Sequence, residues 1–144
     1  MEKVVRFGFS NKKLMKFSNE IRTKVFINEQ HVTPEIEYEH EEEGHYFLLF
    51  TNEKPVATAR WRETDNGIKL ERFALLKEYR NRGLGTVLLK EVIADIKSFN
   101  KTIYLHSQVK AVNYYKRSGF VEVGAHFWEA SIEHVKMEYK PGQL

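Results

Sequence analysis

The chain has no cysteine, and only three of its 144 residues are proline. Without cysteine there is no disulfide framework, no thiolate nucleophile and no cysteine-based metal site, and the composition suits a reducing compartment. No apolar run reaches the length of a membrane-spanning helix. The first residues, Met1–Lys3, lead into a short alternating stretch and not into the apolar core of a signal peptide. We therefore expect a cytoplasmic protein with no membrane partner and no metal.

An excess of charge of one sign is also lacking. Lys and Arg number 23 and Asp and Glu 20, which gives a formal net charge of +3 and a pI of about 9.0. Such a mild balance, without a clustered basic face, does not favour nucleic-acid binding, and we expect no nucleic-acid partner. Hydrophobic residues make up 42% and aromatic residues 13% of the chain. At this length the composition predicts one domain, residues 1–144, with a proper core.

Strand-like and helix-like segments alternate along the chain. Period-two or short apolar stretches predict strands, and apolar residues at 3.6-residue spacing predict helices. Asn66-Gly67 is a hairpin signal, and Gly119 is typical of a helix end. The predicted order is a strand at 5–9, a helix capped by Ser10 or Asn11, strands at 46–50, 55–63 and 68–75, a helix over 87–99, a strand at 102–105, a helix at 111–118, and strands at 120–123 and 135–139. This order predicts an α/β fold with a mainly antiparallel sheet.

A Gly-rich basic turn, Arg80-Asn81-Arg82-Gly83-Leu84-Gly85-Thr86, joins a predicted strand to the longest predicted helix. A helix N-terminus presents unpaired backbone N–H groups and a partial positive charge. Gly83 and Gly85 allow the backbone to approach a ligand closely, and Arg80 and Arg82 add positive charge. The turn therefore predicts a site for a phosphate or pyrophosphate. The pattern alone also fits a simple tight turn that starts a helix.

The turn differs from the better-known phosphate loops. A Walker A loop has Lys between its last Gly and Ser or Thr, and none stands between Gly85 and Thr86. The dinucleotide fingerprint needs a third Gly where Val87 and Leu88 stand.

Two blocks together resemble the GNAT superfamily of acetyltransferases. The first is Arg80-x-x-Gly83-x-Gly85 between strand and helix, and the second is Ala111-x-x-Tyr114-Tyr115-Lys116-x-x-Gly119-Phe120. The resemblance covers the whole chain. It extends to a subgroup of small, poorly characterised bacterial members through four further segments, Ile21-Arg22, Val25-Phe26-Ile27-Asn28-Glu29-Gln30, Leu70-Glu71-Arg72 and Ile132-Glu133-His134.

The resemblance implies a GNAT-like fold, a mixed and mostly antiparallel central sheet flanked by helices and splayed at an acetyl-CoA site. It implies that acetyl-CoA is the co-substrate, that Arg80–Thr86 wrap its pyrophosphate, and that Asn113 lies near it. In the family the fourth strand contacts the pantetheine arm, which corresponds here to Phe73, Ala74 and Leu75. The sequence departs from the family at Gln108, where members often carry Asn.

The resemblance also implies acetyl transfer to an amine by direct attack, with Tyr115 as general acid. A phenol can protonate the departing thiolate if it lies within hydrogen-bond reach. Glu71 matches a position of a catalytic or substrate-binding Glu in some members, and strand alternation places Glu71, Phe73 and Leu75 on one face. Glu71 can equally pair with Arg60 or Arg62. The other candidates for the base are Glu29, His106, His134 and a water chain, and the backbone N–H of Leu75 is a candidate to polarise the acetyl carbonyl.

Several alternatives stay open. Residues 35–43, rich in Glu, are either an acidic lip for a cationic amine or a solvated loop. The aromatic residues Phe26, Tyr38, Phe127 and Trp128 either line an acceptor pocket or belong to the core. The acceptor is expected to be a small-molecule amine or a peptide, and a homodimer is left open. The alternative function is a non-catalytic module that binds CoA or another phosphate ligand and acts through a partner. A third and weaker interpretation is nucleic-acid binding through Arg80 and Arg82.

Overall fold

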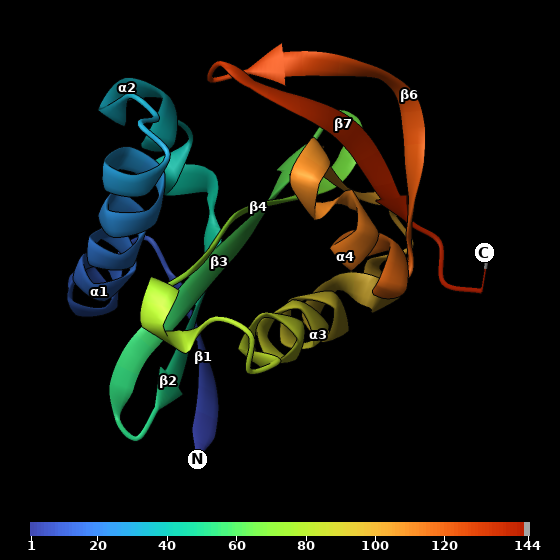
Figure 1. Cartoon of the computed structure of the whole chain (residues 1–144). Coiled ribbons are helices and arrows are strands. Elements are labelled where there is room, and N and C mark those ends of the chain that lie inside the picture. The colour runs from blue at the N-terminus through green and yellow to red at the C-terminus, as the bar shows by residue number, and fades with distance from the viewer. Residues whose placement is uncertain (143–144) are drawn as a thin grey trace.

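One sheet organises the molecule. The computed structural model describes residues 1–142, without the side chain of Ile36. Within these residues seven strands lie in the order β1-β2-β3-β4-β5-β7-β6 (Figure 1). Only the pair β4 and β5 is parallel, so the predicted mixed, mostly antiparallel α/β fold is confirmed. The strands are β1 (Glu2–Gly8), β2 (His45–Thr51), β3 (Lys54–Thr64), β4 (Gly67–Leu75), β5 (Ile103–Gln108), β6 (Phe120–Glu129) and β7 (Ile132–Tyr139).

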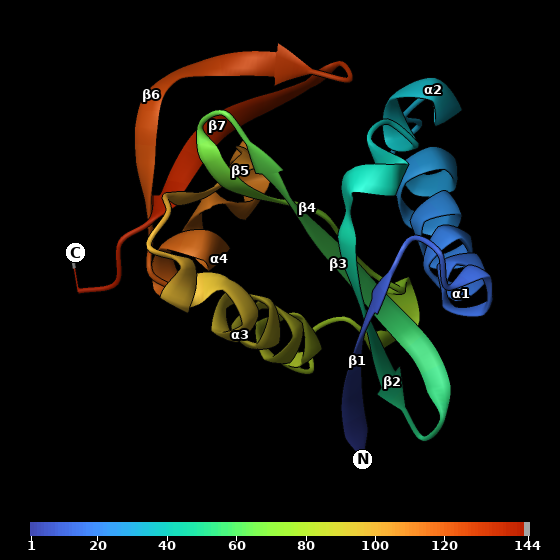
Figure 2. The same ribbon diagram turned by 180° about the vertical axis from the view of Figure 1, so that it is seen from behind.

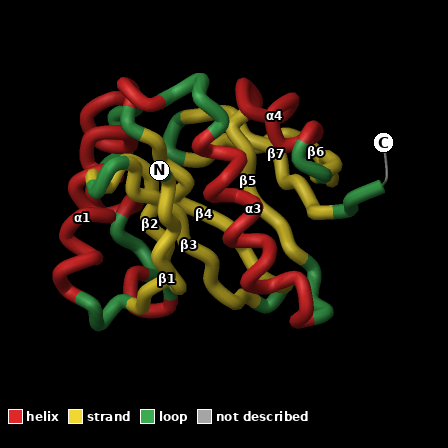
Figure 3. The backbone as a smooth tube through the Cα atoms, turned by 90° about the horizontal axis from the view of Figure 1, so that it is seen from below, coloured by secondary structure: helices red, strands yellow, loops and turns green. Residues whose placement is uncertain are grey.

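Helices cover both faces of the sheet. The α-helices are α1 (Lys12–Arg22), α2 (Pro34–Glu37), α3 (Leu84–Ile96) and α4 (Val112–Arg117). A π-helical segment, Thr23–Glu29, continues α1, and short 3-10 turns occupy Glu41–Glu43, Lys77–Tyr79, Lys97–Phe99 and Val109–Ala111. Seen from behind and from below, α1 lies on one side of β1 to β4 and α3 lies on the other (Figures 2 and 3).

Two hydrophobic clusters hold these layers together. Leu88, Val92 and Ile96 of α3 are buried against the sheet, as their helical spacing predicts. On the opposite face Met15 and Ile21 of α1 form a second cluster with residues of β1 and β2. Full burial of one such side chain stabilises the fold by about 1.5–3 kcal/mol. The predicted cap of α1 is confirmed, because the Asn11 side chain accepts a hydrogen bond of 3.1 Å from the Leu14 N–H.

The hairpin of β6 and β7 is longer than predicted. Its tip residues Ala130 and Ser131 adopt φ values of 51° and 62°, a turn that Asn or Gly usually signals. The register shifts between Val123 and Phe127, and Gly124 there has a φ of 81°. At this irregularity β6 bends over the end of the sheet (Figure 1). Within residues 1–142 no helix is long and apolar enough to cross a membrane.

Candidate active site

The sheet opens between its two parallel strands. Pairing of β4 with β5 begins at Ile68 and Ile103 and ends at Leu70 and Leu105. Beyond this point β4 remains paired with β3 as far as Leu75, whereas β5 pairs with β7. The edge of residues 71–75 that faces β5 therefore has no partner strand among the described residues. We call this opening the sheet gap.

A bulge in β4 lies at the start of the sheet gap. Thr58 of β3 is opposite Ala74, and Arg60 is opposite Glu71. Two residues, Arg72–Phe73, therefore face one residue of β3. Arg72 has a φ of 58°, and the left-handed conformation costs about 1–2 kcal/mol for a residue with a side chain. The surrounding structure must hold this conformation in place, and such backbone strain is common at functional sites.

The bulge reverses the alternation of β4. Before it, Leu70 packs in the cluster under α3; after it, Phe73 and Leu75 pack against that same cluster. Glu71 instead lies on the α1 face, where it contacts Arg60. The prediction that Glu71, Phe73 and Leu75 share a face is wrong, because the extra residue shifts the two-residue period by one.

The Gly-rich turn leads into α3 as predicted. Gly83 has a φ of 75° and caps the helix without a side-chain hydrogen bond. Asn81 also adopts a left-handed φ, of 65°. The Val87 N–H bonds to the Gly83 carbonyl, so the N–H groups of residues 84–86 precede the first helical bond. A Cβ on Gly83 would meet nothing within 4 Å. The turn thus presents open backbone donors, which suits an oxyanion such as pyrophosphate.

The arginines of the turn contact other parts of the protein. Arg80 donates from Nε to the Leu75 carbonyl at 3.0 Å and forms two hydrogen bonds, of 2.8 and 3.0 Å, with Glu29. Arg82 donates to the Glu78 carbonyl at 3.2 Å and lies over the ring of Tyr79. Arg80 therefore fixes the turn to the end of β4 and to the π-helical segment. Charge in the turn comes mainly from its backbone and from Arg82.

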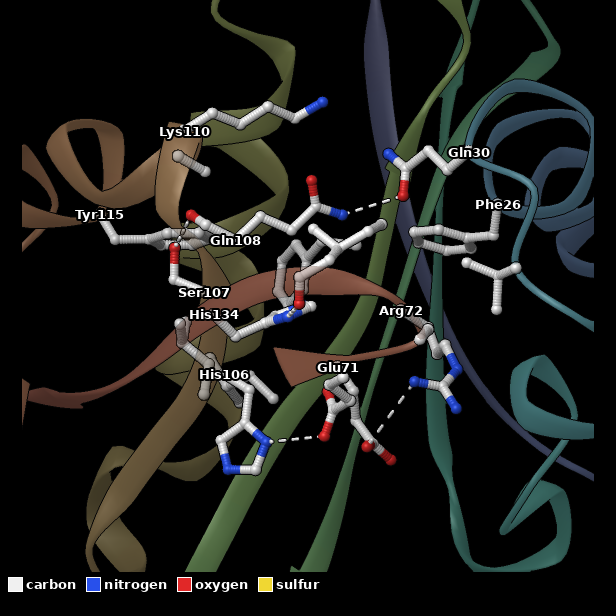
Figure 4. A pocket seen from close by; sticks show the side chains of 18 of the residues that line it. Phe26, Gln30, Glu71, Arg72, His106, Ser107, Gln108, Lys110, Tyr115 and His134 are labelled. Atoms are coloured by element: carbon white, nitrogen blue, oxygen red, sulfur yellow. Dashed lines mark hydrogen bonds and ion pairs between the residues drawn. The ribbon is translucent and has the colours of Figure 1, made fainter. Parts of the chain in front are cut away.

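A cavity of about 290 Å³ fills the sheet gap. Tyr115 and Lys110 enter it from one side, and Phe26 and Gln30 lie on the other (Figure 4). A hydrogen bond of 2.9 Å from Gln108 Nε2 to Gln30 Oε1 spans the cavity. The lining residues are Phe26, Gln30, Val32, Glu37, Lys69, Leu70, Glu71, Arg72, Phe73, Leu105, His106, Ser107, Gln108, Lys110, Ala111, Tyr115, Glu129, Ala130, Ile132 and His134. The cavity thus brings together Tyr115, Glu71 and Phe73 of the predicted site.

The other predicted site residues lie outside this cavity. Ala74 packs in the cluster under α1, and Leu75 packs against the cluster under α3. Asn113 is exposed in α4. Thr86 lies beside α4, with its hydroxyl 3.3 Å from that of Tyr114. Asn113, Thr86 and the Gly-rich turn therefore lie along α3 and α4, whereas the side chains of Ala74 and Leu75 pack into the two hydrophobic clusters.

Tyr115 is held by aromatic contacts. Its ring centroid lies 5.1 Å from that of Tyr114 and 5.7 Å from that of Phe120. Its hydroxyl has no hydrogen-bond partner among the described residues. Burial raises the pKa of Tyr115 above its ordinary value, so the phenol keeps its proton at neutral pH. The geometry leaves this proton available to a group that enters the cavity.

Glu71 is surrounded by cations. Its carboxylate lies 2.9 Å from Arg60, 2.6 Å from Arg62, 3.4 Å from Lys69 and 4.0 Å from Arg72. Burial by itself would raise the pKa of Glu71, but these charges outweigh it and lower the pKa to about 2. The pairing with Arg60 and Arg62 is thus present, and a carboxylate this acidic is a poor base at neutral pH.

His134 has a defined tautomer. Its Nδ1 lies 2.7 Å from the Ile132 carbonyl oxygen, and a carbonyl oxygen can only accept, so Nδ1 carries a proton. In the neutral ring Nε2 is then an acceptor with no hydrogen-bond partner among the described residues. His134 is 7% exposed and lies between the cavity and the ring of Phe127.

The two remaining candidates for the base are already paired. His106 Nδ1 lies 3.3 Å from a carboxylate oxygen of Glu129. The hydrogen bond from Arg80 lowers the pKa of Glu29. Glu29 is therefore a weak base, and among the candidates from the sequence His134 has the most suitable geometry.

Two residues of the Glu-rich stretch, Glu37 and Glu41, have a structural role. Glu37 and Glu41 bind Arg22, which is fully buried, and Glu41 also binds Arg60. These pairs tie α2 and the 3-10 turn to the sheet. Glu35, Glu39, Glu42 and Glu43 of the same stretch are exposed, so the acidic lip for a cationic amine stays a prediction.

The four aromatic residues have separate environments. Phe26 lines the cavity. Tyr38 bonds to Thr23 through its hydroxyl. Phe127 contacts the ring of His106 edge to face and stacks on the ring of His134, and Trp128 is 72% exposed. Only Phe26 and, through the histidines, Phe127 belong to the site.

The sequence patterns missed Lys69 and Arg72 as parts of the site. Both line the cavity, and in the sequence each is only one charged residue of an alternating strand. Among the described residues no group of three or more His, Asp or Glu has the geometry of a metal site.

Comparison with known proteins identifies the family. The family model "Acetyltransferase (GNAT) domain" matches residues 9–141. The chain is 34% identical over 130 residues to the Bacillus subtilis uncharacterized N-acetyltransferase YjcF, with 88% of this chain and 93% of the relative covered. It is 35% identical over 122 residues to Bacillus subtilis YyaT, with 81% and 82% covered.

Solved structures have the same fold. The crystal structure of Escherichia coli ElaA superposes with a TM-score of 0.86 at 21% identity, covering 97% of this chain and 100% of the other. An acyl-CoA N-acyltransferase from Pseudomonas aeruginosa gives a TM-score of 0.84 at 19% identity, covering 96% and 99%. The solved structures share the fold, and the family model with the curated relatives shows that the chain belongs to the GNAT acetyltransferase superfamily.

Proposed function

We propose that the protein transfers the acetyl group of acetyl-CoA to a primary amine by direct attack within a ternary complex. The main support for this proposal is the sheet gap. The Gly-rich turn lies on one side of it, and Tyr115 and His134 line it from opposite faces of the sheet. Tyr115 packs against the cluster under α3. Val135, the neighbour of His134, belongs to that cluster, so His134 points to the other face.

The residues present fit acetyl-CoA. The open N–H groups at the start of α3 suit its pyrophosphate, and the unpaired edge of residues 71–75 offers backbone groups to a pantetheine amide. We assign cofactor binding to Phe73, Ala74, Leu75, Arg80–Thr86 and Asn113. Acetyl-CoA supplies the acetyl group as a thioester. Because the Leu75 carbonyl accepts a hydrogen bond from Arg80, its N–H is the more available group of this residue.

We assign the general acid to Tyr115. A departing thiolate needs a proton; Tyr115 lines the cavity, and its hydroxyl has no hydrogen-bond partner in the part of the chain that the structure describes. A protonated phenol is a suitable donor to a thiolate. The chain has no cysteine, so an acetyl-cysteine intermediate is excluded and direct attack is the simplest route.

We assign the general base to His134 in preference to Glu71. The attacking amine must be neutral, and the neutral His134 ring presents Nε2 as an acceptor. Glu71 instead orders Arg60, Arg62 and Lys69 around itself. In this assignment Glu71 holds the cations of the site in position and does not accept the proton of the attacking amine.

Thiol release tests the function. The protein is incubated with acetyl-CoA and a panel of primary amines, and free CoA thiol is measured beside the acetylated product. We expect release that depends on the amine and falls in the Tyr115→Phe variant. Binding of acetyl-CoA without amine-dependent release from any acceptor would favour a non-catalytic CoA-binding module.

A further inference from the structure

Lys69 is a nearly buried cation at the closed end of the sheet gap. It lies opposite Tyr104 in the short parallel pairing of β4 with β5, one residue before that pairing ends. Its side chain is 13% exposed and lines the cavity with Glu71 and His134. Strand alternation puts Lys69 on the same face as Glu71, the face on which His134 also lies.

Lys69 has a weak partner. Its ammonium lies 3.4 Å from Glu71 Oε2, and it forms no hydrogen bond within residues 1–142. The other oxygen of Glu71 already accepts hydrogen bonds of 3.0 Å from Arg60 and 2.6 Å from Arg62. A buried ammonium normally needs full pairing, because desolvation penalises a charge without hydrogen bonds. The three N–H donors of Lys69 are therefore available to an anion.

The surroundings of Lys69 carry excess positive charge. Five cations meet three buried or nearly buried carboxylates in one connected network. The cations are Arg22, Arg60, Arg62, Lys69 and Arg72, and the carboxylates are Glu37, Glu41 and Glu71. Only Lys69 and Arg72 of these cations line the cavity. The field of the network therefore attracts a negative group into the cavity.

The two nearest other carboxylates, Glu129 and Glu43, offset only part of this excess. Glu129, at the hairpin tip, also lines the cavity and interacts electrostatically with Lys69, but it is 45% exposed and pairs with His106. Glu43 lies 3.9 Å from Arg62 and is 56% exposed. Water screens both charges more than it screens the buried network.

On the basis of the proposed function, we propose that the acceptor is a small amine that carries a carboxylate, which Lys69 binds at the closed end of the sheet gap. The amine of the same molecule then lies toward His134. A cavity of about 290 Å³ that must also admit the thioester leaves room for a small acceptor. The class is therefore that of amino acids and other short amino carboxylates.

Matched acceptors test the carboxylate. Each amino acid is compared with its carboxamide and with the amine that lacks the carboxyl group, by thiol release from acetyl-CoA. We expect kcat/KM to be about 10–100-fold higher for the carboxylate, the range for loss of one charged hydrogen bond. Equal or better use of the amide and the plain amine would overturn the inference and leave the proposed function intact. No release with any amine would contradict the proposed function itself, and the inference with it.

Substitution of Lys69 tests its role directly. Lys69→Met is expected to raise KM for the carboxylate acceptor about 10–100-fold. The preference for the carboxylate over the amide should then disappear. KM for the amide and the dissociation constant of acetyl-CoA should not change. Lys69→Arg is expected to retain much of the preference. The matched control is Lys136→Met, since Lys136 lies on the same face over the ring of Tyr104 but does not line the cavity. An unchanged preference in a folded Lys69→Met protein would overturn the inference.

Discussion

The Nδ1 atom of His134 and the carbonyl oxygen of Ile132 lie 2.7 Å apart, two residues from each other on the same strand. This hydrogen bond holds the ring in one tautomer and leaves Nε2 as its acceptor. The contact depends on the start of β7, immediately after the left-handed turn at Ala130 and Ser131. The hairpin therefore supplies both the position and the tautomer of the proposed base.

Replacement of His134 by Ala should lower kcat about 10²–10⁴-fold, the usual contribution of a positioned acid or base. Binding of acetyl-CoA should be unchanged, because no residue of the Gly-rich turn lines the cavity that His134 lines. Added imidazole should restore part of the rate by occupying the vacated space. His106→Ala is the matched control, and it should keep most of the activity. If His134→Ala retained full kcat, the base would have to be another group or water.

Replacement of Tyr115 by Phe removes only the hydroxyl and keeps the ring contacts with Tyr114 and Phe120. We expect kcat to fall by about 10²-fold, the low end for an acid, since a thiolate is already a fair leaving group. The dissociation constant of acetyl-CoA should hardly change. Because burial raises the pKa of Tyr115, any loss of rate from its ionisation should appear only at strongly alkaline pH. Full turnover by the variant would return Tyr115 to a packing role.

Replacement of Gly85 by Ala tests the Gly-rich turn without strain. Gly85 lies in the first turn of α3, where a Cβ would be 3.4 Å from the Tyr114 hydroxyl. Ala favours a helix over Gly by up to about 1 kcal/mol, so the melting temperature should stay level or rise. Acetyl-CoA at about 100 times its dissociation constant should stabilise the wild type by about 2.7 kcal/mol. We expect acetyl-CoA to raise the melting temperature of the variant much less than that of the wild type. An equal rise would mean that the phosphates of acetyl-CoA do not bind at the Gly-rich turn.

Replacement of Glu71 by Gln should act on stability first. Loss of one carboxylate from a buried charge network costs about 3–5 kcal/mol, because several cations then lose their partner. Since the folded-state pKa of Glu71 is lowered to about 2, its stabilisation is present above the unfolded value of about 4.3 and is lost as the pH falls toward 2. Denaturant melts of wild type and variant should converge over that window. A constant difference from pH 7 to pH 2 would contradict this role.

Local patterns predicted much of the fold. The cap at Asn11, the spacing of Leu88, Val92 and Ile96, and the turn at Gly83 each depend on residues close in sequence, and each is present. Tyr115 could be placed because its motif and the short helix around it are local too.

The acceptor side depends on features that leave no local signal. The bulge at Arg72 and the hairpin turn at Ala130 and Ser131 use left-handed residues that are not Gly. The pairing of Arg22 with Glu37 joins residues 15 positions apart through tertiary packing. Propensity and periodicity describe neither. The pairing of Glu71 with Arg60 and Arg62 could be anticipated as a contact between neighbouring strands, but the sequence could not show that Lys69 and Arg72 also approach Glu71 or that His134 lines the cavity.

Direct transfer in the sheet gap is tested best by following a labelled acetyl group. The protein is incubated with acetyl-CoA that carries a radioactive acetyl group, first alone and then with an amine acceptor identified by thiol release. We predict no label bound covalently to the protein, then one labelled amide and one free thiol for each amine consumed. Label retained on the protein that passes to the amine on its addition, or thiol release with no acetylated amine, would contradict direct acetyl transfer.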